Sequence, residues 1–136
     1  MSYELKDHTA DVAVEATAES LDGVFAAVAD GMAEAMCEDV PTGGQRRSLS
    51  VTAESREALL FDYLDELIYE RDVQGVLPVD NETTVQNEGS EWHLDGSYRG
   101  VPLADVTARD LKAVTYSEMD ISETEKGWHA YVVFDV

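Results

Sequence analysis

Two acidic residues stand at distant points of the chain where strands are predicted to begin and end. Asp11 closes the stretch 8–11 and opens one strand, whereas Asp135 lies at the end of another. If these strands pair, the two carboxylates face each other, and carboxylates that close favour a cation between them. Val136 adds main-chain and terminal oxygens as further hard ligands. Oxygen donors of this kind suit Ca²⁺ or Mg²⁺ better than zinc.

The same residues also have ordinary structural explanations. An Asp at a junction between a loop and a strand commonly caps a turn with its side chain, and His8 then supports that turn. Taken alone, His8 and Asp11 favour this explanation. For Asp135 the alternatives, a metal ligand or an exposed residue at the end of the chain, are balanced.

Lys112 is the other residue with a possible chemical role. It stands on a predicted strand in a chain that contains only three lysines. Its ammonium can meet a phosphate, or it can pair with Asp110 or with an acid on a neighbouring strand, which is the commoner arrangement. The sequence contains no Ser-His-Asp order, P-loop, CxxC or HExxH, so no motif supports nucleophilic or zinc catalysis.

The charge of the chain is far from balanced. Twenty-nine acidic residues against nine basic ones give a net charge of −20. Such a surface repels itself at ordinary ionic strength, whereas at about 1 M salt the Debye length falls to about 3 Å. The composition therefore predicts a protein from a halophile. It also argues against strong direct binding of nucleic acid, which depends on Lys and Arg contacts to phosphates.

Length and composition predict one domain spanning residues 1–136. The hydrophobic fraction of 44% is that of an ordinary globular protein that buries a core. With Cys37 as its sole cysteine, the chain forms no internal disulfide and no thiolate metal cluster. It has no signal-peptide pattern and no apolar run of about 20 residues, so we expect a cytoplasmic protein that does not enter the membrane.

Hydrophobic periodicity predicts two helices and several strands. Ser20 is a good N-cap for an amphipathic helix that runs to about Cys37, and Ser55 for a second one with apolar positions through Ile68. The predicted strands are 12–17, 48–53, 83–86 and 92–98 around a hairpin turn, 111–119, and 128–136 after a polar turn at 122–127. This order predicts an α+β fold with both helices packed on one face of a largely antiparallel sheet.

Four segments, taken in order, resemble the archease family. They are YE at 3–4 with HTADV at 8–12, LDELIY at 64–69, LKAVTY at 111–116, and WHAYVVFDV at 128–136. Each is weak alone, but together they reach from one end of the chain to the other. One departure is visible, because the archaeal pattern continues with His after LKAVTY and this chain has Ser117.

The resemblance implies a strand-helix-strand-strand (SHS2-type) fold with inserted strands. It also implies a non-enzymatic role in tRNA processing, as the cofactor protein that helps an RtcB-type tRNA-splicing RNA ligase through guanylylation and so permits multiple turnover. The resemblance implies that the family's metal site corresponds to Asp11, Asp135 and the main-chain oxygen of Val136, and that the bound metal is calcium or another divalent cation. Lys112 matches a lysine that the family uses functionally, and a histidine contribution at position 117 is in doubt.

Two other functions fit some of the same residues. A metal-dependent phosphohydrolase could use Asp11 and Asp135 as ligands, but only His8 is nearby in sequence as a general base. A non-catalytic adaptor could use a sheet edge or helix face for protein interaction. The match of four ordered segments favours the ligase cofactor protein over both.

Overall fold

A computed structural model describes residues 2–7 and 11–136 of this chain, with the backbone alone described at residues 6 and 7. Its elements in chain order are β1 (Ser2–Asp7), β2 (Asp11–Ala18), α1 (Leu21–Met36), β3 (Gln45–Ala53), α2 (Arg56–Gln74), β4 (Val76–Glu88), β5 (Glu91–Pro102), the 3₁₀ turn η1 (Leu103–Asp105), β6 (Ala113–Val114), β7 (Asp120–Thr124) and β8 (Gly127–Asp135). Among the described residues, no helix is both long and apolar enough to cross a membrane.

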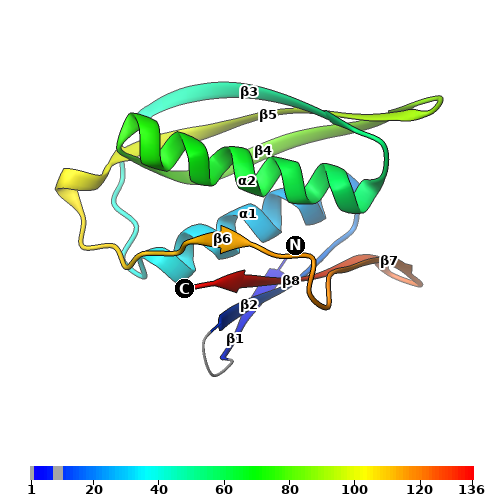
Figure 1. Ribbon diagram of the computed structural model, residues 1–136, viewed down its shortest axis with the longest axis horizontal. Coiled ribbons are helices and arrows are strands. Elements are labelled where there is room, and N and C mark those ends of the chain that lie inside the picture. The colour runs from blue at the N-terminus through cyan, green and yellow to red at the C-terminus, as the bar shows by residue number, and fades with distance from the viewer. Residues whose placement is uncertain (1, 8–10) are drawn as a thin grey trace.

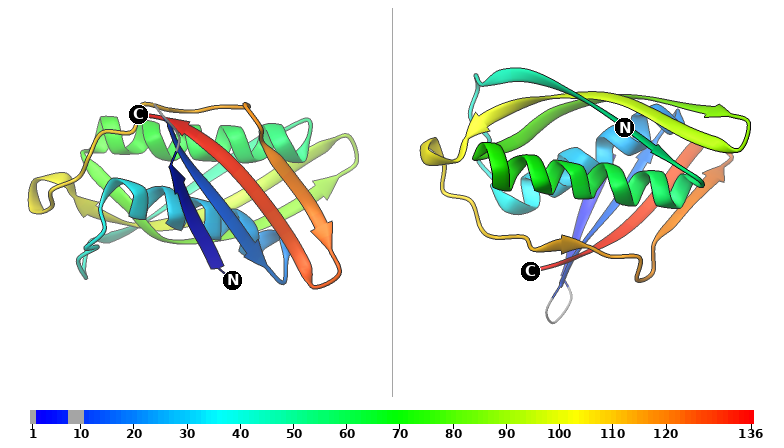
Figure 2. Two further views of the ribbon diagram at one scale, coloured as in Figure 1. Left: turned by 90° about the horizontal axis from the view of Figure 1, so that it is seen from below. Right: turned by 45° about the horizontal axis from the view of Figure 1, so that its top comes forward.

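The strands form two antiparallel sheets with the helices between them. One sheet has the order β1-β2-β8-β6, with β7 also pairing with β8, and the other has the order β3-β5-β4. Figure 1 shows β3, β5 and β4 as the upper layer, α1 and α2 in the middle, and β1, β2, β8 and β6 as the lower layer. Figure 2 shows the same layers from two further directions. The α+β class with two helices and antiparallel pairing is therefore confirmed.

The number of sheets differs from the sequence prediction, which had one. The reason lies in α1, which the sequence pattern presented as an amphipathic helix. In the structure, α1 contacts β4 of one sheet and β2 of the other, and eleven of its residues are buried. Small side chains permit this double contact: a Cβ added at Gly31 would come within 2.6 Å of Val14.

Both helices begin where their caps predict. The Ser20 hydroxyl accepts a hydrogen bond from the Gly23 N–H, and the Ser55 hydroxyl accepts one from the Ala58 N–H, each at 3.0 Å. These bonds satisfy N–H groups that lack a partner within the helix. Gly75, in the left-handed conformation, ends α2 and turns the chain into β4.

The predicted strand 111–119 is wrong over most of its length. Only Ala113–Val114 forms register pairs with β8 in this stretch, and pairing resumes at Asp120, before the predicted polar turn 122–127, and continues into it as far as Thr124. Glu118 adopts a positive φ of 59°, which is incompatible with a continuous strand. Tyr116 leaves the sheet and stacks on Phe61 of α2, with ring centroids 4.2 Å apart. The predicted hairpin turn before position 91 is correct, but its strands are longer than predicted and run 76–88 and 91–102.

Arg56, at the start of α2, joins all three layers through aromatic contacts. Its guanidinium carbon lies 5.1 Å from the ring centroid of Trp128 on β8 and 5.9 Å from that of Trp92 on β5. A cation above an aromatic face is attracted by the ring quadrupole. Arg56 therefore links the two sheets at the end of the molecule where α2 begins.

Arg56→Gln is expected to lower the free energy of unfolding by about 1 kcal/mol, because two cation–π contacts are lost together. Urea-induced unfolding of the variant and the parent protein measures this difference. Lys126→Gln removes the same charge from an exposed position and serves as the control. Equal losses in both variants would mean that only the net charge matters.

Candidate metal centre

Asp11 and Asp135 lie directly opposite each other in the structure. They form the last register pair of the antiparallel ladder between β2 and β8. Residues directly opposite in such a ladder point to the same face, with Cβ atoms about 5 Å apart. Asp11 is half-buried and Asp135 is exposed. The predicted meeting of the two strand ends is confirmed.

Lys112 is brought to the same place by β6. Its backbone N–H donates to the Asp135 carbonyl at 2.8 Å, and the next residue, Ala113, is the register partner of Asp135. The expected pairing of Lys112 with Asp110 is not what the structure shows. Asp110 instead lies 3.7 Å from Arg71, and the Lys112 side chain is exposed. Among the described residues, no ion pair uses Lys112.

The remaining predicted residues have different outcomes. Val136 is half-buried and packs against the hydrophobic core, so its main chain is held next to Asp135. Ser117 is exposed in the segment between β6 and β7. His8 lies outside the described residues, and its predicted supporting role stays a prediction.

The donor set fits a hard divalent cation. Like charges directly opposite in a ladder repel, so a bound cation between Asp11 and Asp135 would relieve an unfavourable contact. No third His, Cys, Asp or Glu side chain within the described ranges completes a metal-binding group with them. Main-chain oxygen, with that of Val136 as a candidate, and water would have to supply the other ligands. Ca²⁺ and Mg²⁺ accept such mixed oxygen shells, whereas zinc favours nitrogen and sulfur.

Arg71, which sequence reasoning did not single out, holds the segment that carries Lys112. Its guanidinium is buried and donates to the Leu111 carbonyl at 2.7 Å. It also contacts the Met36 sulfur at 3.2 Å and Asp72 at 2.9 Å. In the sequence, Arg71 is simply an arginine in the last turn of a predicted helix, where arginines are usually exposed. Its burial, which shows that it holds another segment, is visible only in the structure. Arg71 therefore holds the backbone immediately before Lys112 in place.

His129 lies between two carboxylates on the outer face of the same sheet. Its Nε2 is 3.0 Å from Glu15 of β2, and its Nδ1 is 3.2 Å from Asp120 of β7. The hydrogen bond with Glu15, followed by that with Asp120, raises the pKa of His129 above its ordinary value, although partial burial opposes this. From the sequence, His129 is predicted to be an ordinary strand residue, because Glu15 and Asp120 are not next to it in the chain.

The pairing of protonated His129 with Glu15 and Asp120 is expected to stabilise the fold fully below about pH 6.5, the ordinary histidine pKa. Because the folded-state pKa is raised, this stabilisation is lost as the pH rises through the raised value. Thermal melting of the parent protein and of His129→Gln between pH 6 and 9 measures the effect. The parent's advantage should shrink with rising pH, and a difference independent of pH would contradict the charged-histidine explanation.

Comparison of the chain with known proteins identifies its family. The model of the archease protein family matches residues 3–136. The chain belongs to the archease family. Among similar archeases, that of Methanosarcina mazei is 30% identical over 98% of this chain and 95% of its own, and that of Archaeoglobus fulgidus is 30% identical over the full length of both.

Two solved structures share the fold. The solution structure of Methanobacterium thermoautotrophicum protein 1598 superposes with a TM-score of 0.85 at 28% identity and covers 98% of both chains. The crystal structure described as an archease, possible chaperone, from Thermotoga maritima has a TM-score of 0.60 at 20% identity, covering 96% of this chain and 94% of its own. At 20% identity, the similarity to the Thermotoga maritima structure shows a shared fold and nothing further.

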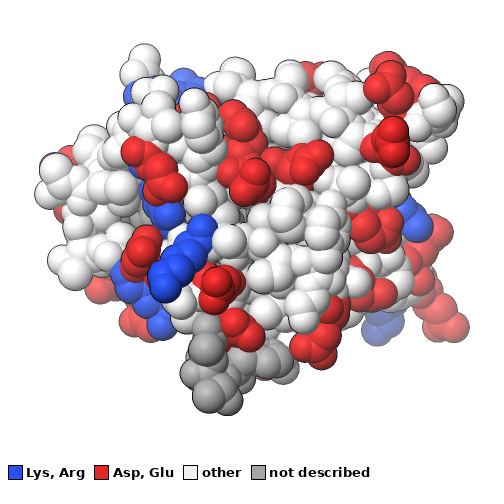
Figure 3. All heavy atoms as spheres, in the orientation of Figure 1, with Lys and Arg blue, Asp and Glu red and all other residues white. Residues whose placement is uncertain are grey.

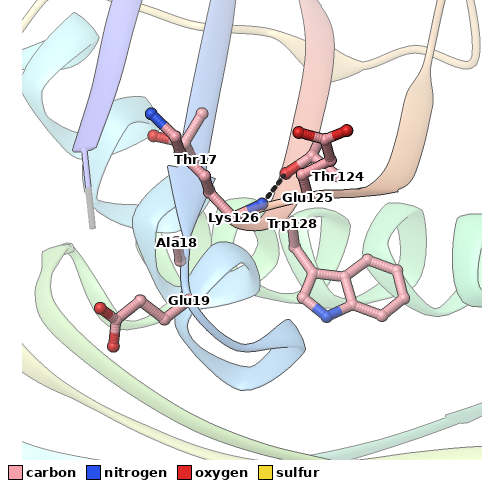
Figure 4. A pocket seen from close by; sticks show the side chains of 7 residues that line it. All are labelled: Thr17, Ala18, Glu19, Thr124, Glu125, Lys126 and Trp128. Carbon is pink, nitrogen blue, oxygen red and sulfur yellow. Dashed lines mark hydrogen bonds between the residues drawn. The ribbon is translucent and has the colours of Figure 1, made fainter.

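The surface at the end of the molecule where Asp11 and Asp135 pair differs from that at the opposite end. Figure 3 shows acidic side chains over much of this face, with basic side chains gathered toward the end of the molecule where β8 ends. At the opposite end, an open hollow of about 540 Å³ lies between the β7–β8 hairpin and the end of β2 with the following Glu19. Figure 4 shows Trp128 as one wall of that hollow and Lys126 across from it, with the Lys126 N–H bonded to Thr124. Asp11, Asp135 and Lys112 do not line it.

Proposed function

We propose that this chain is the cofactor protein of an RtcB-type tRNA-splicing RNA ligase, and that it promotes guanylylation and multiple turnover of that enzyme. Membership of the archease family supports this role. The observation that carries the proposal is the register pair of Asp11 and Asp135, with Lys112 bonded beside it. We name this group, Asp11, Asp135, Lys112 and the main-chain oxygen of Val136, the tip.

The tip can act on phosphate groups without a nucleophile of its own. Asp11 and Asp135 would hold a divalent cation, calcium in our proposal, which when bound supplies positive charge toward phosphate oxygens. The exposed ammonium of Lys112 adds a second positive charge beside it. Arg71 donates to the Leu111 carbonyl, and the Lys112 N–H donates to the Asp135 carbonyl, so both polar atoms of the peptide group before Lys112 are held and its side chain begins from a defined position. The protein therefore places charge in the ligase pocket and leaves the joining chemistry to the ligase.

A ligation time course with limiting cognate ligase tests this function. With GTP and metal present, product should exceed one equivalent per ligase only when this protein is added. Single turnover with and without the protein would refute the proposal. Phosphate release from a phosphorylated substrate by the protein alone, abolished by chelation, would instead support the phosphohydrolase.

We further propose that the acidic surface is an adaptation to concentrated salt. Raising KCl from about 0.1 M to about 2 M should raise the melting temperature markedly, because screening removes the self-repulsion of a net charge of −20. Calorimetry across this range gives the measurement, and sucrose at equal osmolality is the control for an effect of excluded solute. A melting temperature that does not respond to KCl would rule out the adaptation.

A further inference from the structure

Two hollows meet along the C-terminal half of α1. The larger, about 870 Å³, is lined by residues from β1, β2, the end of α1 and the segment after η1. The smaller, about 250 Å³, lies against β4 and β5. Glu34, in the last turn of α1, and Glu38, two residues beyond its end, line both. We call the two hollows together the α1 groove.

The α1 groove begins beside the tip. Val12, which follows Asp11 in β2, lines it, and so does Arg109, three residues before Lys112. The Arg109 N–H donates to the Met36 carbonyl at 2.8 Å, which ties the segment after η1 to the end of α1. Figure 1 shows the end of α1 and the segment after η1 converging on the side where β8 ends. A protein that receives the tip in a pocket would therefore also meet the groove.

Acidic side chains outnumber basic ones around the groove, although Arg109 lines the larger hollow and Asp80, in the smaller one, pairs with Arg46. Glu38, Asp39 and Asp105 line the larger hollow and take part in no ion pair among the described residues. The last turn of α1 carries no basic residue, so the negative end of the helix dipole adds to these charges. Arg99, in the smaller hollow, already donates to the carbonyls of Pro41 and Gly43.

The groove also exposes apolar surface. Leu5 is 39% exposed in the larger hollow and Val40 is 37% exposed in the smaller one. Lysine and arginine combine an aliphatic stem with a cationic head, so they match carboxylates at the rim of an apolar floor. Nucleic acid does not match, because its phosphates would face these carboxylates. A metal ion does not match either, since no metal-binding group of side chains occurs within the described residues.

We infer that the α1 groove is the docking surface for a basic segment of the ligase, one that inserts Lys or Arg side chains between apolar residues. This inference rests on the proposed function and adds to it a second contact, separate from the tip. Docking through the groove would hold the ligase while the tip enters its active site. Loss of the groove contact should thus weaken binding, whereas loss of the tip should stop turnover.

Charge reversal on the two sides of the groove tests the inference. Glu38→Arg with Asp105→Arg changes two exposed residues, one just after α1 and one on η1. The matched control, Glu123→Arg with Glu125→Arg, makes the same change of charge on the β7–β8 hairpin. Binding of the cognate ligase is measured by biolayer interferometry at constant KCl. The groove variant should raise the Kd at least about tenfold, and the control should leave it within about twofold.

Each other outcome has a definite meaning. If both variants bind like the parent, or both weaken equally, the groove is not the docking surface, although parent-stimulated multiple turnover would leave the proposed function standing. If the parent neither binds the ligase nor stimulates it, the proposed function and the inference fail together. Circular dichroism shows whether the groove variant folds. If it does not, the same assay is run with a neutralising variant, Glu38→Gln with Asp105→Asn. Its control is then Glu123→Gln with Glu125→Gln.

Discussion

Asp11→Asn and Asp135→Asn should each return the ligase to a single turnover. The two carboxylates are opposite each other in the β2–β8 ladder, so each variant removes half of the charge that would hold a divalent cation. We expect the affinity for that cation to fall by at least about a hundredfold, since even outer-shell changes cost 10–100-fold. The measurements are ligation product per ligase and calcium binding by calorimetry.

Stability separates this explanation from simple damage to the fold. In the presence of a chelator, each Asp→Asn variant should be slightly more stable than the parent, by about 0.5 kcal/mol, because a like-charge pair has been removed. Added calcium should raise the melting temperature of the parent and not of the variants. Glu123→Gln, which removes an exposed carboxylate from the β7–β8 hairpin, should bind calcium and support turnover like the parent. Variants that lose stability without metal would contradict the like-charge interpretation.

Arg71→Met should cause the largest loss of stability, about 2–4 kcal/mol. The substitution leaves the Leu111 carbonyl without the donor that now lies 2.7 Å away, and an unsatisfied buried acceptor costs about 1–3 kcal/mol. Lost packing of the buried guanidinium against Met36 adds to this cost. We give little weight to its pairs with Asp72 and Asp110, because those carboxylates are largely exposed. Urea unfolding gives the free-energy difference.

The same variant should also impair ligase activation under conditions where it is fully folded, since the segment carrying Lys112 has lost its anchor. Arg46→Met is the matched control, because Arg46 is an arginine whose pairs with Asp80 and Glu82 are on the surface. Its loss should be below about 1 kcal/mol, with turnover unchanged. If folded Arg71→Met activates the ligase like the parent protein, Arg71 does not position Lys112.

Several features of this protein could be predicted from local sequence. Ser20 and Ser55 mark the helix starts, because a side-chain cap depends only on the next three residues. Alternating apolar residues place Val12, Val14 and Ala16 in the core, on the side of β2 away from Asp11. The same alternation in β8 places Asp135 on the outer face, so the two acids meet once β2 and β8 pair as antiparallel neighbours in the observed register.

Other features depended on contacts between distant segments. The sequence could not show that α1 lies between two sheets, since burial on its second face comes from β4, far along the chain. It missed the break at residues 115–119, where Tyr116 leaves the sheet for a stacking partner 55 positions earlier, Phe61. Tertiary packing overrode the β-propensity of that segment.

At the tip, the sequence alone determined which residues carry oxygen ligands and which lysine stands apart. Only the tertiary structure decided that the Lys112 N–H donates to the Asp135 carbonyl, while Asp110 lies near Arg71. Arg71, on a helix about 40 residues earlier, holds the Leu111 carbonyl of the same peptide group. The types of side chain present are a local property of a sequence. Which of them satisfy one another is settled by the packing of distant elements, where each buried polar group must find a partner.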